Sequence, residues 1–363
     1  MAKREGWGTR VGLVLAVAGN AVGLGNFLRF PAQAAQNGGG AFLIPYLISF
    51  LLMGIPLLWV EWAIGRHGGR YGHHSTPGML DRLGSYRWLK YVGVFGLFTN
   101  LTVASYYCYI ESWTLAYVFH SLWGTFHTQA PTEFFPHYLG ETADSIFALP
   151  WQALFWFVLT LGLNVWILSR GLAKGIELAC FIGMPLLILF GVVLAIRGLT
   201  LTTADPGVIQ SPLAGLNFVW QPQLGGLLNP STWLAAAGQI FFTLSVGMGS
   251  IHCYAAYVRA DDDIALNAAS AGWMNEFVEI ILGGSILIPI ATAYLGLGVV
   301  QAATSGGSGF SLGFLTLPTL FNNLGWFAPI AGAMWFGLLF LAGITSSMAM
   351  GQPVMAFLED EFK

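Results

Sequence analysis

Long apolar stretches constrain this chain more than any other feature of its sequence. About eight of them reach the roughly 18 residues that a helix needs to cross a bilayer, and they lie near residues 11–36, 41–65, 88–123, 151–169, 176–197, 232–257, 264–300 and 325–358. Hydrophobic residues make up 56% of the 363 residues, charged residues 9%, and the mean hydropathy is +0.67. A soluble protein with an apolar core has no need of such runs, so the sequence predicts a polytopic all-α membrane protein.

The loops between these stretches alternate in charge, which predicts the orientation. Residues 66–90 and the turn after the fourth stretch contain Arg66, Arg70, Arg82, Arg87, Lys90, Arg170 and Lys174, whereas residues 124–150 contain Glu133, Glu141 and Asp144 and no lysine or arginine. The positive-inside rule therefore places the amino terminus, with Lys3 and Arg4, in the cytoplasm, and we expect a multi-pass protein of the inner (plasma) membrane. Its basic start, MAKREGWGTR, is not followed by a signal-peptide pattern. No feature indicates a nucleic-acid partner.

The three cysteines lie inside apolar stretches and form no CxxC pair. They are Cys108, Cys180 and Cys253. We interpret them as buried small hydrophobic residues, and we expect neither a disulfide nor a structural zinc site.

Three of the stretches contain residues that weaken a membrane helix. The first contains GNAVGLGNFLRFP (19–31), the sixth TLSVGMGS (243–250) and the eighth AGITSSMAMGQP (342–353). Small residues alone often indicate close helix packing, and Gly19 and Gly23 have the spacing of such a motif. Interruptions in both the first and the sixth stretch instead favour a transporter, because paired broken helices mark the binding sites of such proteins.

A broken helix in hydrocarbon exposes main-chain groups that a ligand must satisfy. Amides at the start of a half-helix suit an anion, and free carbonyls at the end of another suit cations, so a pair of breaks suits a zwitterion. The polar side chains near the breaks carry oxygens: Asn20, Asn26, Thr243, Ser245, Asn275, Thr345 and Ser346. Oxygen ligands favour sodium over zinc or copper.

Charges inside a membrane are costly and need a reason. Five charged residues fall within the apolar stretches: Arg29, Glu61, Glu111, Glu276 and Glu279. Each can be part of a buried structural pair or have a functional role, and both interpretations stay open. Asn275 and Glu279 share one helical face.

Four segments carry a family resemblance: GNAVGLGNFLRFP, NGGGAF (37–42), GQIFFTLSVGMG (238–249) and AGITSS (342–347). In these segments the chain resembles the neurotransmitter:sodium symporter family of sodium-dependent transporters. The resemblance implies a LeuT-type inverted-repeat fold with discontinuous first and sixth helices, and sodium-coupled import of amino acids by alternating access. It implies one transporter domain over 1–363, with a first five-helix repeat at 1–197 and a partial second repeat at 198–363. Members have about twelve spans, so we expect a fragment or a natural truncation. The helices of a family homodimer would lie beyond Lys363.

The resemblance also implies the ligands of two sodium ions. The first ion would be held by Ala21, Asn26, Thr243, Asn275 and the substrate carboxylate. The second would be held by Gly19, Val22, Ala342, Thr345 and Ser346.

For the substrate, the resemblance implies a site formed by the two breaks. The carboxylate would meet Leu24, Gly25 and Tyr107, and the ammonium group would meet Ala21, Phe242, Thr243 and Ser245, with Asn20 nearby. The side chain would lie among Val103, Tyr107, Phe242, Met248, Ser346 and Met350. This pocket has no charge and indicates hydrophobic amino acids. The chain departs from its relatives at Met248 and Met350, and these two flexible thioethers predict acceptance of larger, including aromatic, side chains.

The resemblance assigns further roles to charged residues. Arg29, with Tyr107 and Phe242, resembles an outer gate. Arg4, Trp7, Tyr257 and Asp360 resemble an inner gate, in which Arg4 and Asp360 would form a salt bridge, although spacing alone would equally fit ordinary surface charges. Glu279 stands where chloride-dependent members lack a carboxylate, so we expect chloride-independent transport.

Other functions remain open at this stage. A proton-coupled permease of the same architecture would keep the breaks but lack the hydroxyl pair Thr345 and Ser346. A non-transporting amino-acid receptor or an inactive fragment would need binding only. An enzyme is disfavoured, because the histidines His67, His73, His74 and His252 show no metal-ligand spacing.

Overall fold

The computed structural model describes residues 6–84, 86, 88–141, 149–305 and 309–362, and within these residues all regular secondary structure is helical. The fold is the predicted all-α one. Lys3, Arg4, Arg87 and Asp144 lie outside the described residues.

Helices occupy all the predicted spans. They are α1 (Arg10–Ala21) with α2 (Leu24–Gln36), α3 (Gly40–Ser49) with α4 (Ile55–Arg70), α6 (Leu89–Leu122), α9 (Trp151–Leu168), α10 (Glu177–Leu199), α12 (Pro230–Thr243) with α13 (Ser250–Ala256), α14 (Ile264–Glu276) with α15 (Gly284–Leu295), and α18 (Ala328–Phe362). Wider π-helical turns join α3 to α4 (Phe50–Gly54) and α14 to α15 (Phe277–Gly283), and another (Leu172–Ile176) precedes α10. Five continuous helices of the described part are long and apolar enough to cross a membrane, and α1 with α2 makes a sixth as one bent pair.

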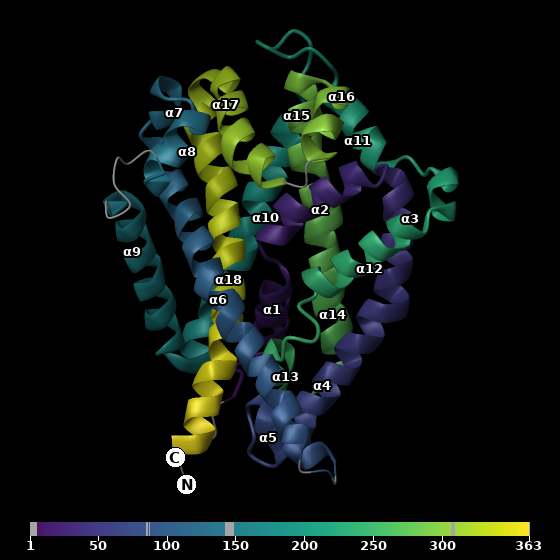
Figure 1. Cartoon of the computed structure of the whole chain (residues 1–363), viewed down its shortest axis with the longest axis vertical. Helices are drawn as coiled ribbons and strands as arrows, with labels where there is room; N and C mark the ends of the chain where they lie inside the picture. Colours follow the sequence, from purple (N-terminus) through teal and green to yellow (C-terminus); the bar gives the residue numbers. More distant parts are fainter. Residues whose placement is uncertain (1–5, 85, 87, 142–148, 306–308, 363) are drawn as a thin grey trace.

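Shorter helices cover the two ends of the bundle. α5 (Thr76–Leu83) lies at the end that holds both termini, whereas α7 (Thr125–Thr128), α8 (Pro131–Leu139), α11 (Pro212–Trp220), α16 (Leu297–Ser305) and α17 (Leu317–Phe321) lie at the opposite end (Figure 1). The remaining helical turns are Leu224–Leu228, Ser311–Thr316 and Asn322–Phe327. The basic segment 66–90 and the acidic segment 124–150 therefore lie at opposite ends in their described parts, in agreement with the predicted alternation.

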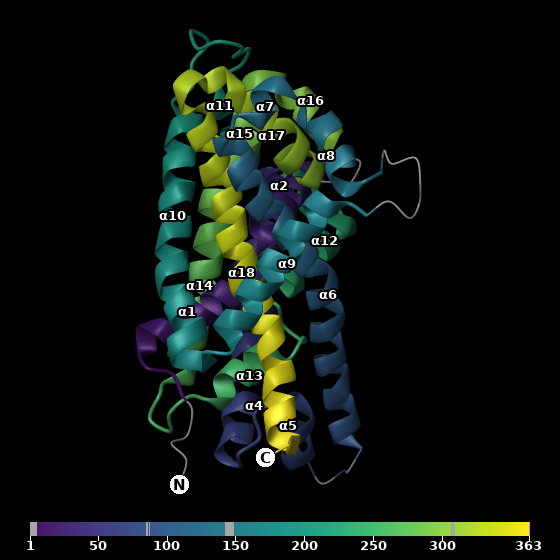
Figure 2. The ribbon, with the colours of Figure 1, turned by 90° about the vertical axis from the view of Figure 1, so that its left-hand side faces the viewer.

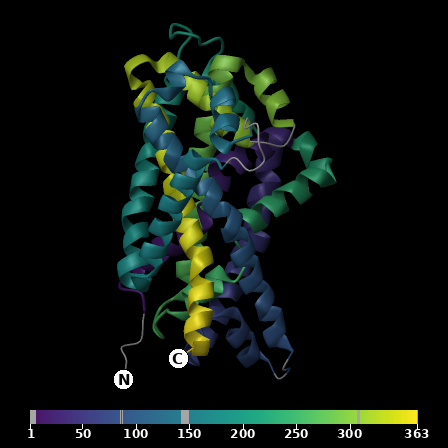
Figure 3. The same cartoon turned by 60° about the vertical axis from the view of Figure 1, so that its left-hand side comes forward.

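Helix α1 lies in the middle of the bundle, where it packs against α10, α14, α18 and α13. Its residues Leu13, Ala16, Val17 and Ala18 are at most 2% exposed. A helix that is apolar on all sides is buried on all sides. Around it, α6 packs along α18, and α18 runs for most of the height of the molecule (Figures 2 and 3). The helix that was expected to break is thus enclosed by protein.

The eighth stretch is not interrupted, contrary to the weakening suggested by its sequence. α18 continues as one helix of 35 residues through residues 342–353. The hydroxyl of Thr345 bonds back to the helix itself, because its Oγ1 donates to the carbonyls of Leu341 and Ala342 at 3.1 Å each. Such bonding slightly destabilises a helix but is compatible with a continuous one. Its small residues serve packing: a Cβ on Gly343 would lie 3.0 Å from the Glu111 side chain of α6.

Candidate functional site

The first break lies between α1 and α2, whose axes differ by 49°. Val22 and Gly23 have extended backbone angles there. A Cβ on Gly23 would lie 2.9 Å from Tyr107 Oη and 3.0 Å from Ser346 Oγ, so this position has room only for glycine. The absent side chain lets neighbouring hydroxyl groups approach the open main chain.

The second break is residues 244–249, between α12 and α13. Ser245, Gly247 and Gly249 have φ angles of 55°, 85° and 93°, and Ser245 is the only described non-glycine residue with a positive φ. Positive φ reverses the helical path, and it is costly for a residue with a side chain. Both predicted discontinuities, in the first and the sixth span, are therefore confirmed.

The two breaks line one cavity of about 300 Å³. Its lining is Asn20, Ala21, Gly23, Gly25, Asn26, Thr99, Val103, Tyr106, Tyr107, Phe241, Phe242, Thr243, Ser245, Met248, Ser346 and Met350. Every residue predicted to bind substrate is in this set except Leu24, whose backbone N–H donates to Tyr107 Oη at 3.2 Å beside it. Thr99, Tyr106 and Phe241 were missed. Thr99 could have been predicted from helical spacing, because it lies one turn before Val103 on α6.

Residues predicted to hold the first sodium ion lie together on one side of this cavity. Asn26 Nδ2 donates to Asn275 Oδ1 at 2.8 Å and to Glu279 Oε2 at 3.0 Å, and Asn275 Nδ2 donates to Thr243 Oγ1 at 3.1 Å. Thr243 Oγ1 also donates to Glu279 Oε2. The oxygen of Asn26 accepts from Gly23 N–H at 2.8 Å. The cluster is buried, and the carboxylate of Glu279 within it is 0% exposed.

Residues predicted to hold the second ion meet where α18 crosses the first break. Ser346 Oγ lies within hydrogen-bond distance of three main-chain carbonyl oxygens, those of Gly19 and Asn20 at 3.3 Å and that of Val22 at 3.4 Å. Thr345 Oγ1 and the carbonyl of Ala342 lie one helical position away and are 3.1 Å apart. All five predicted ligands are thus neighbours. Their donor atoms are oxygens, which is the set that fits a hard alkali cation.

The predicted outer gate lies directly above the cavity lining. The Arg29 guanidinium sits 4.6 Å from the centre of the Phe242 ring and donates to Gln239 Oε1. Gln239 Nε2 in turn donates to Glu279 Oε1 at 2.6 Å. A network of hydrogen bonds therefore connects Arg29 with the carboxylate of the first cluster.

The predicted inner-gate residues gather at the end that holds the termini. Trp7 Nε1 donates to the carbonyl of Tyr254 at 3.0 Å, and the Tyr257 ring stacks on His74 at 4.4 Å. Asp360 accepts hydrogen bonds from the backbone N–H groups of His74 and Ser75, at 2.8 and 3.1 Å. Its predicted partner Arg4 lies outside the described residues.

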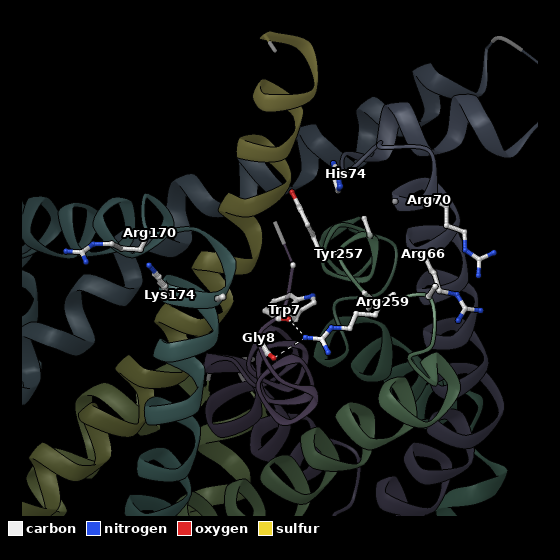
Figure 4. A pocket seen from close by; sticks show the side chains of 15 residues that line it. Trp7, Gly8, Arg66, Arg70, His74, Arg170, Lys174, Tyr257 and Arg259 are labelled. Carbon is white, nitrogen blue, oxygen red and sulfur yellow. Dashed lines mark hydrogen bonds between the residues drawn. The ribbon is translucent and has the colours of Figure 1, made fainter. Parts of the chain in front are cut away.

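A larger cavity of about 890 Å³ opens beside these gate residues (Figure 4). Its charged lining residues are Arg66, Arg70, Arg170, Lys174 and Arg259. No main-chain group of either break lines it. The smaller, central cavity is therefore the candidate binding site, and the larger one is a vestibule at the basic end.

Comparisons with known proteins agree with this geometry. The profile of the Sodium:neurotransmitter symporter family matches residues 4–128 and 124–363. A sodium-dependent transporter of Methanocaldococcus jannaschii is 31% identical over 99% of this chain and 70% of its own. The sodium-dependent nutrient amino acid transporter 1 of Drosophila melanogaster is 27% identical over 100% of this chain and 62% of its own.

Among solved structures, that of MhsT in complex with L-phenylalanine is similar over 99% of this chain and 76% of MhsT, with 34% sequence identity and a TM-score of 0.80. The matched relatives are thus longer than this chain. The family profile extends over nearly the whole sequence, and its members are transporters rather than enzymes. The protein belongs to the sodium:neurotransmitter symporter family.

Proposed function

We propose that the protein binds a hydrophobic amino acid together with two sodium ions in the central cavity and imports both by alternating access. The observation that supports this most is the convergence of two interrupted helices on one cavity of about 300 Å³. The main-chain amides and carbonyls that the breaks release from regular helical bonding are suited to the two charged ends of a zwitterion. The apolar side chains of Val103, Met248 and Met350 are suited to its side chain.

In this proposal the amino-acid carboxylate lies against the amides of Leu24 and Gly25 and the hydroxyl of Tyr107. The ammonium group lies against main-chain carbonyls of Ala21, Phe242 and Thr243 and the oxygen of Ser245. Tyr107 already accepts from Leu24 N–H at 3.2 Å, so the hydroxyl and the amide are close enough to hold one carboxylate between them.

The first sodium ion is held by Ala21, Asn26, Thr243 and Asn275 and by the substrate carboxylate, which couples ion to substrate. Asn26 directs its amide nitrogen at Asn275 and Glu279. A cation there requires this amide to turn its oxygen inward. The second ion is held by the carbonyls and hydroxyls around Ser346.

Two methionines line the part of the cavity assigned to the substrate side chain. Thioether side chains adapt to ligands of different shape, and L-phenylalanine is the ligand in the solved structure of MhsT. We therefore propose that the protein accepts large apolar and aromatic amino acids. Confinement to alanine and glycine in a competition assay would contradict this.

Chloride independence follows from Glu279. This carboxylate is 0% exposed and belongs to the first ion cluster, so it supplies a fixed negative charge where an anion would otherwise be needed. Uptake should persist when gluconate replaces chloride. A collapse of the rate in gluconate would argue against this role of Glu279.

Sodium coupling gives a neutral substrate an energy source. Each sodium ion contributes about 2.3 kcal/mol per 100 mV of membrane potential. Two ions provide about 4.6 kcal/mol, which supports accumulation on the order of a thousandfold.

The decisive experiment is binding and uptake of radiolabelled phenylalanine by purified, reconstituted protein in sodium or potassium buffer. We expect binding and uptake both to require sodium, and we expect the uptake rate to rise more steeply than the first power of the sodium concentration. Binding without uptake would identify a receptor, and sodium-independent, proton-driven uptake would identify a permease of the same architecture. The same measurements should be made on a chain extended past Lys363. Activity of the extended chain alone would indicate a defect of this chain, whereas inactivity of both would indicate that the proposed function is wrong.

A further inference from the structure

A buried carboxylate and a buried imidazole face each other beside the second break. Glu61 on α4 and His252 on α13 have side chains that are only 8% and 11% exposed. Glu61 Oε2 lies 3.5 Å from His252 Nδ1, and neither atom has a hydrogen-bond partner among the described residues. The other oxygen, Oε1, accepts the backbone N–H of Gly247 within the break. One carboxylate thus connects the unwound main chain to a basic side chain.

The surroundings of this pair are tightly packed. A Cβ on Gly65 would lie 2.2 Å from the carbonyl of His252, so α4 and α13 touch at this level with almost no space between them. The elements packed against α4 and α13 include α1, α5, α14 and α18. Across all six helices the titratable and charged groups besides the pair are Arg10, Arg66, His67, Arg70, Tyr71 at the end of α4, Asp81, Arg82, Cys253, Tyr254, Tyr257 at the end of α13, Glu276, Glu359, Asp360 and Glu361.

Four of these groups, Arg10, Arg66, Asp360 and Glu276, have partners other than Glu61 and His252. Arg10 contacts Asp262 at 3.2 Å, Arg66 donates to the carbonyl of Asp262, and Asp360 contacts His74. Glu276 accepts from Asn275. No hydrogen bond from the described residues reaches the facing atoms of the pair, Glu61 Oε2 and His252 Nδ1.

The number of protons on the pair decides its charge. Without a proton the pair is a carboxylate beside a neutral imidazole, with a net charge of −1. With one proton it is neutral, whether the proton lies on Glu61 or on His252. A dry site strongly favours the neutral state. From this geometry we infer that Glu61 and His252 form a proton-binding site that holds one shared proton, so that protons are a further ligand of this transporter, distinct from sodium and substrate.

The proton has a route to one side of the membrane. His252 lies one helical turn before Ala256 and Tyr257, and both of these residues line the vestibule at the basic end, as does Trp7 (Figure 4). Movement of these aromatic residues would bring water to the pair. Water solvates a bare carboxylate, so Glu61 can release the proton once water reaches it.

This site makes the described arrangement pH-dependent. The closed, dry arrangement binds the proton more tightly than a hydrated one does. Protonation therefore stabilises the closed arrangement at low pH, and this stabilisation is lost as the pH rises. Amino-acid binding to this arrangement should weaken at alkaline pH, with a limiting slope of about tenfold per pH unit for one proton. This link to binding rests on the proposed function.

Glu61→Gln provides the test, because its amide oxygen can accept from Gly247 while its amide nitrogen donates to His252, as a protonated carboxyl group would. We expect this variant to bind phenylalanine in sodium with an affinity that no longer falls at alkaline pH, whereas the wild type loses affinity. Glu111→Gln, a change of another buried carboxylate that lies against Asn164 at 3.0 Å, is the control and should keep the wild-type pH profile. A profile flattened by Glu111→Gln and not by Glu61→Gln would overturn the inference.

Infrared difference spectra between pH values test the site without any substrate. The wild type should show a titrating carboxyl band that is lost in Glu61→Gln and displaced in His252→Leu. A band that is insensitive to both changes refutes the shared proton, even if binding is intact. A band that behaves as expected in protein that binds no amino acid at any pH would leave the proton site standing and refute the proposed function.

Discussion

Gly25 shows, at the scale of single residues, how closely the lid covers the cavity. A Cβ at this position would lie 2.4 Å from Cε1 of Phe242, whose side chain is free to move because the residue is 52% exposed. Gly25→Ala should therefore leave the fold intact but displace the ring, with a loss of about tenfold in phenylalanine affinity. Gly238→Ala on α12 is the matched control, because nothing lies within 4 Å of its Cβ. Equal affinities of the two variants would show that the ring is not part of the site.

Ser346 and Ser347 are adjacent but face different neighbours. Ser346 Oγ lies beside three carbonyls of the first break, whereas Ser347 Oγ donates to Asn164 Oδ1 at 2.7 Å. Ser346→Ala should raise the sodium concentration for half-maximal binding about tenfold and make its sodium dependence less steep. Ser347→Ala should change neither. Sodium titrations of phenylalanine binding measure both, and identical curves for the two variants would remove Ser346 from the ion site.

The sequence alone predicted the kind of ligand that the site residues suit, because this depends only on the type of their atoms. Hydroxyl and amide oxygens near two weak helices indicated a hard cation, and the structure brings those residues together. The orientation of the side chains could not be predicted from the sequence. The direction of the Asn26 amide depends on its bond to Gly23 N–H, and the partner of Arg29 is Gln239, a residue 210 positions away. Such pairings arise only when distant helices pack.

At the scale of elements, glycine content predicted the interruptions only where the backbone needs unusual angles. Residues 244–249 contain three positive φ angles, and the sequence TLSVGMGS supplies two of them with glycine. The segment AGITSSMAMGQP is also rich in small residues, yet it lies inside the continuous helix α18 and contains no positive φ angle. Composition measures how easily a helix can break, and tertiary packing decides whether it does.

The start of α1 depends on α10 as well as on its own N-cap, Thr9, whose Oγ1 accepts from Gly12 N–H at 2.9 Å. The Glu177 carboxylate accepts from Gly8 N–H at 2.7 Å, Thr9 N–H at 3.0 Å and Thr9 Oγ1 at 2.7 Å. Hydrogen bonds to a charged group contribute about 1.5–3 kcal/mol each. Glu177→Gln should loosen residues 7–9, seen as faster amide hydrogen exchange at Trp7, Gly8 and Thr9. Glu133→Gln on the exposed side of α8 should leave that exchange unchanged. Protection retained in Glu177→Gln would mean that the Trp7 ring and the Arg259 guanidinium hold the segment without this carboxylate.

At the scale of the whole molecule, the separation of charged segments predicts the orientation in the membrane. Asp81 on α5 and Glu133 on α8 are exposed at opposite ends. The native cysteines are all buried, so they give little background for thiol labelling. In intact cells a membrane-impermeant maleimide should label the cysteine of Glu133→Cys and not that of Asp81→Cys. The reverse pattern would place the basic end outside.

The architecture as a whole was predictable because span length and paired breaks are properties of local sequence. The vestibule and the packing of α4 on α13 were not, since they depend on contacts such as that between Gly65 and the carbonyl of His252.

The continuity of α18 has a mechanical consequence. The helix carries Thr345 and Ser346 at the first break and Asp360 at the basic end. Fifteen residues at 1.5 Å each separate Thr345 from Asp360 by about 22 Å, and the helix continues between them through Pro353. A small tilt at the upper contacts is magnified with distance, so binding of the proposed second ion beside Ser346 would displace Asp360, which anchors residues 74–75. An unbroken eighth span therefore acts as a lever, whereas an interrupted one would dissipate the same movement at the interruption.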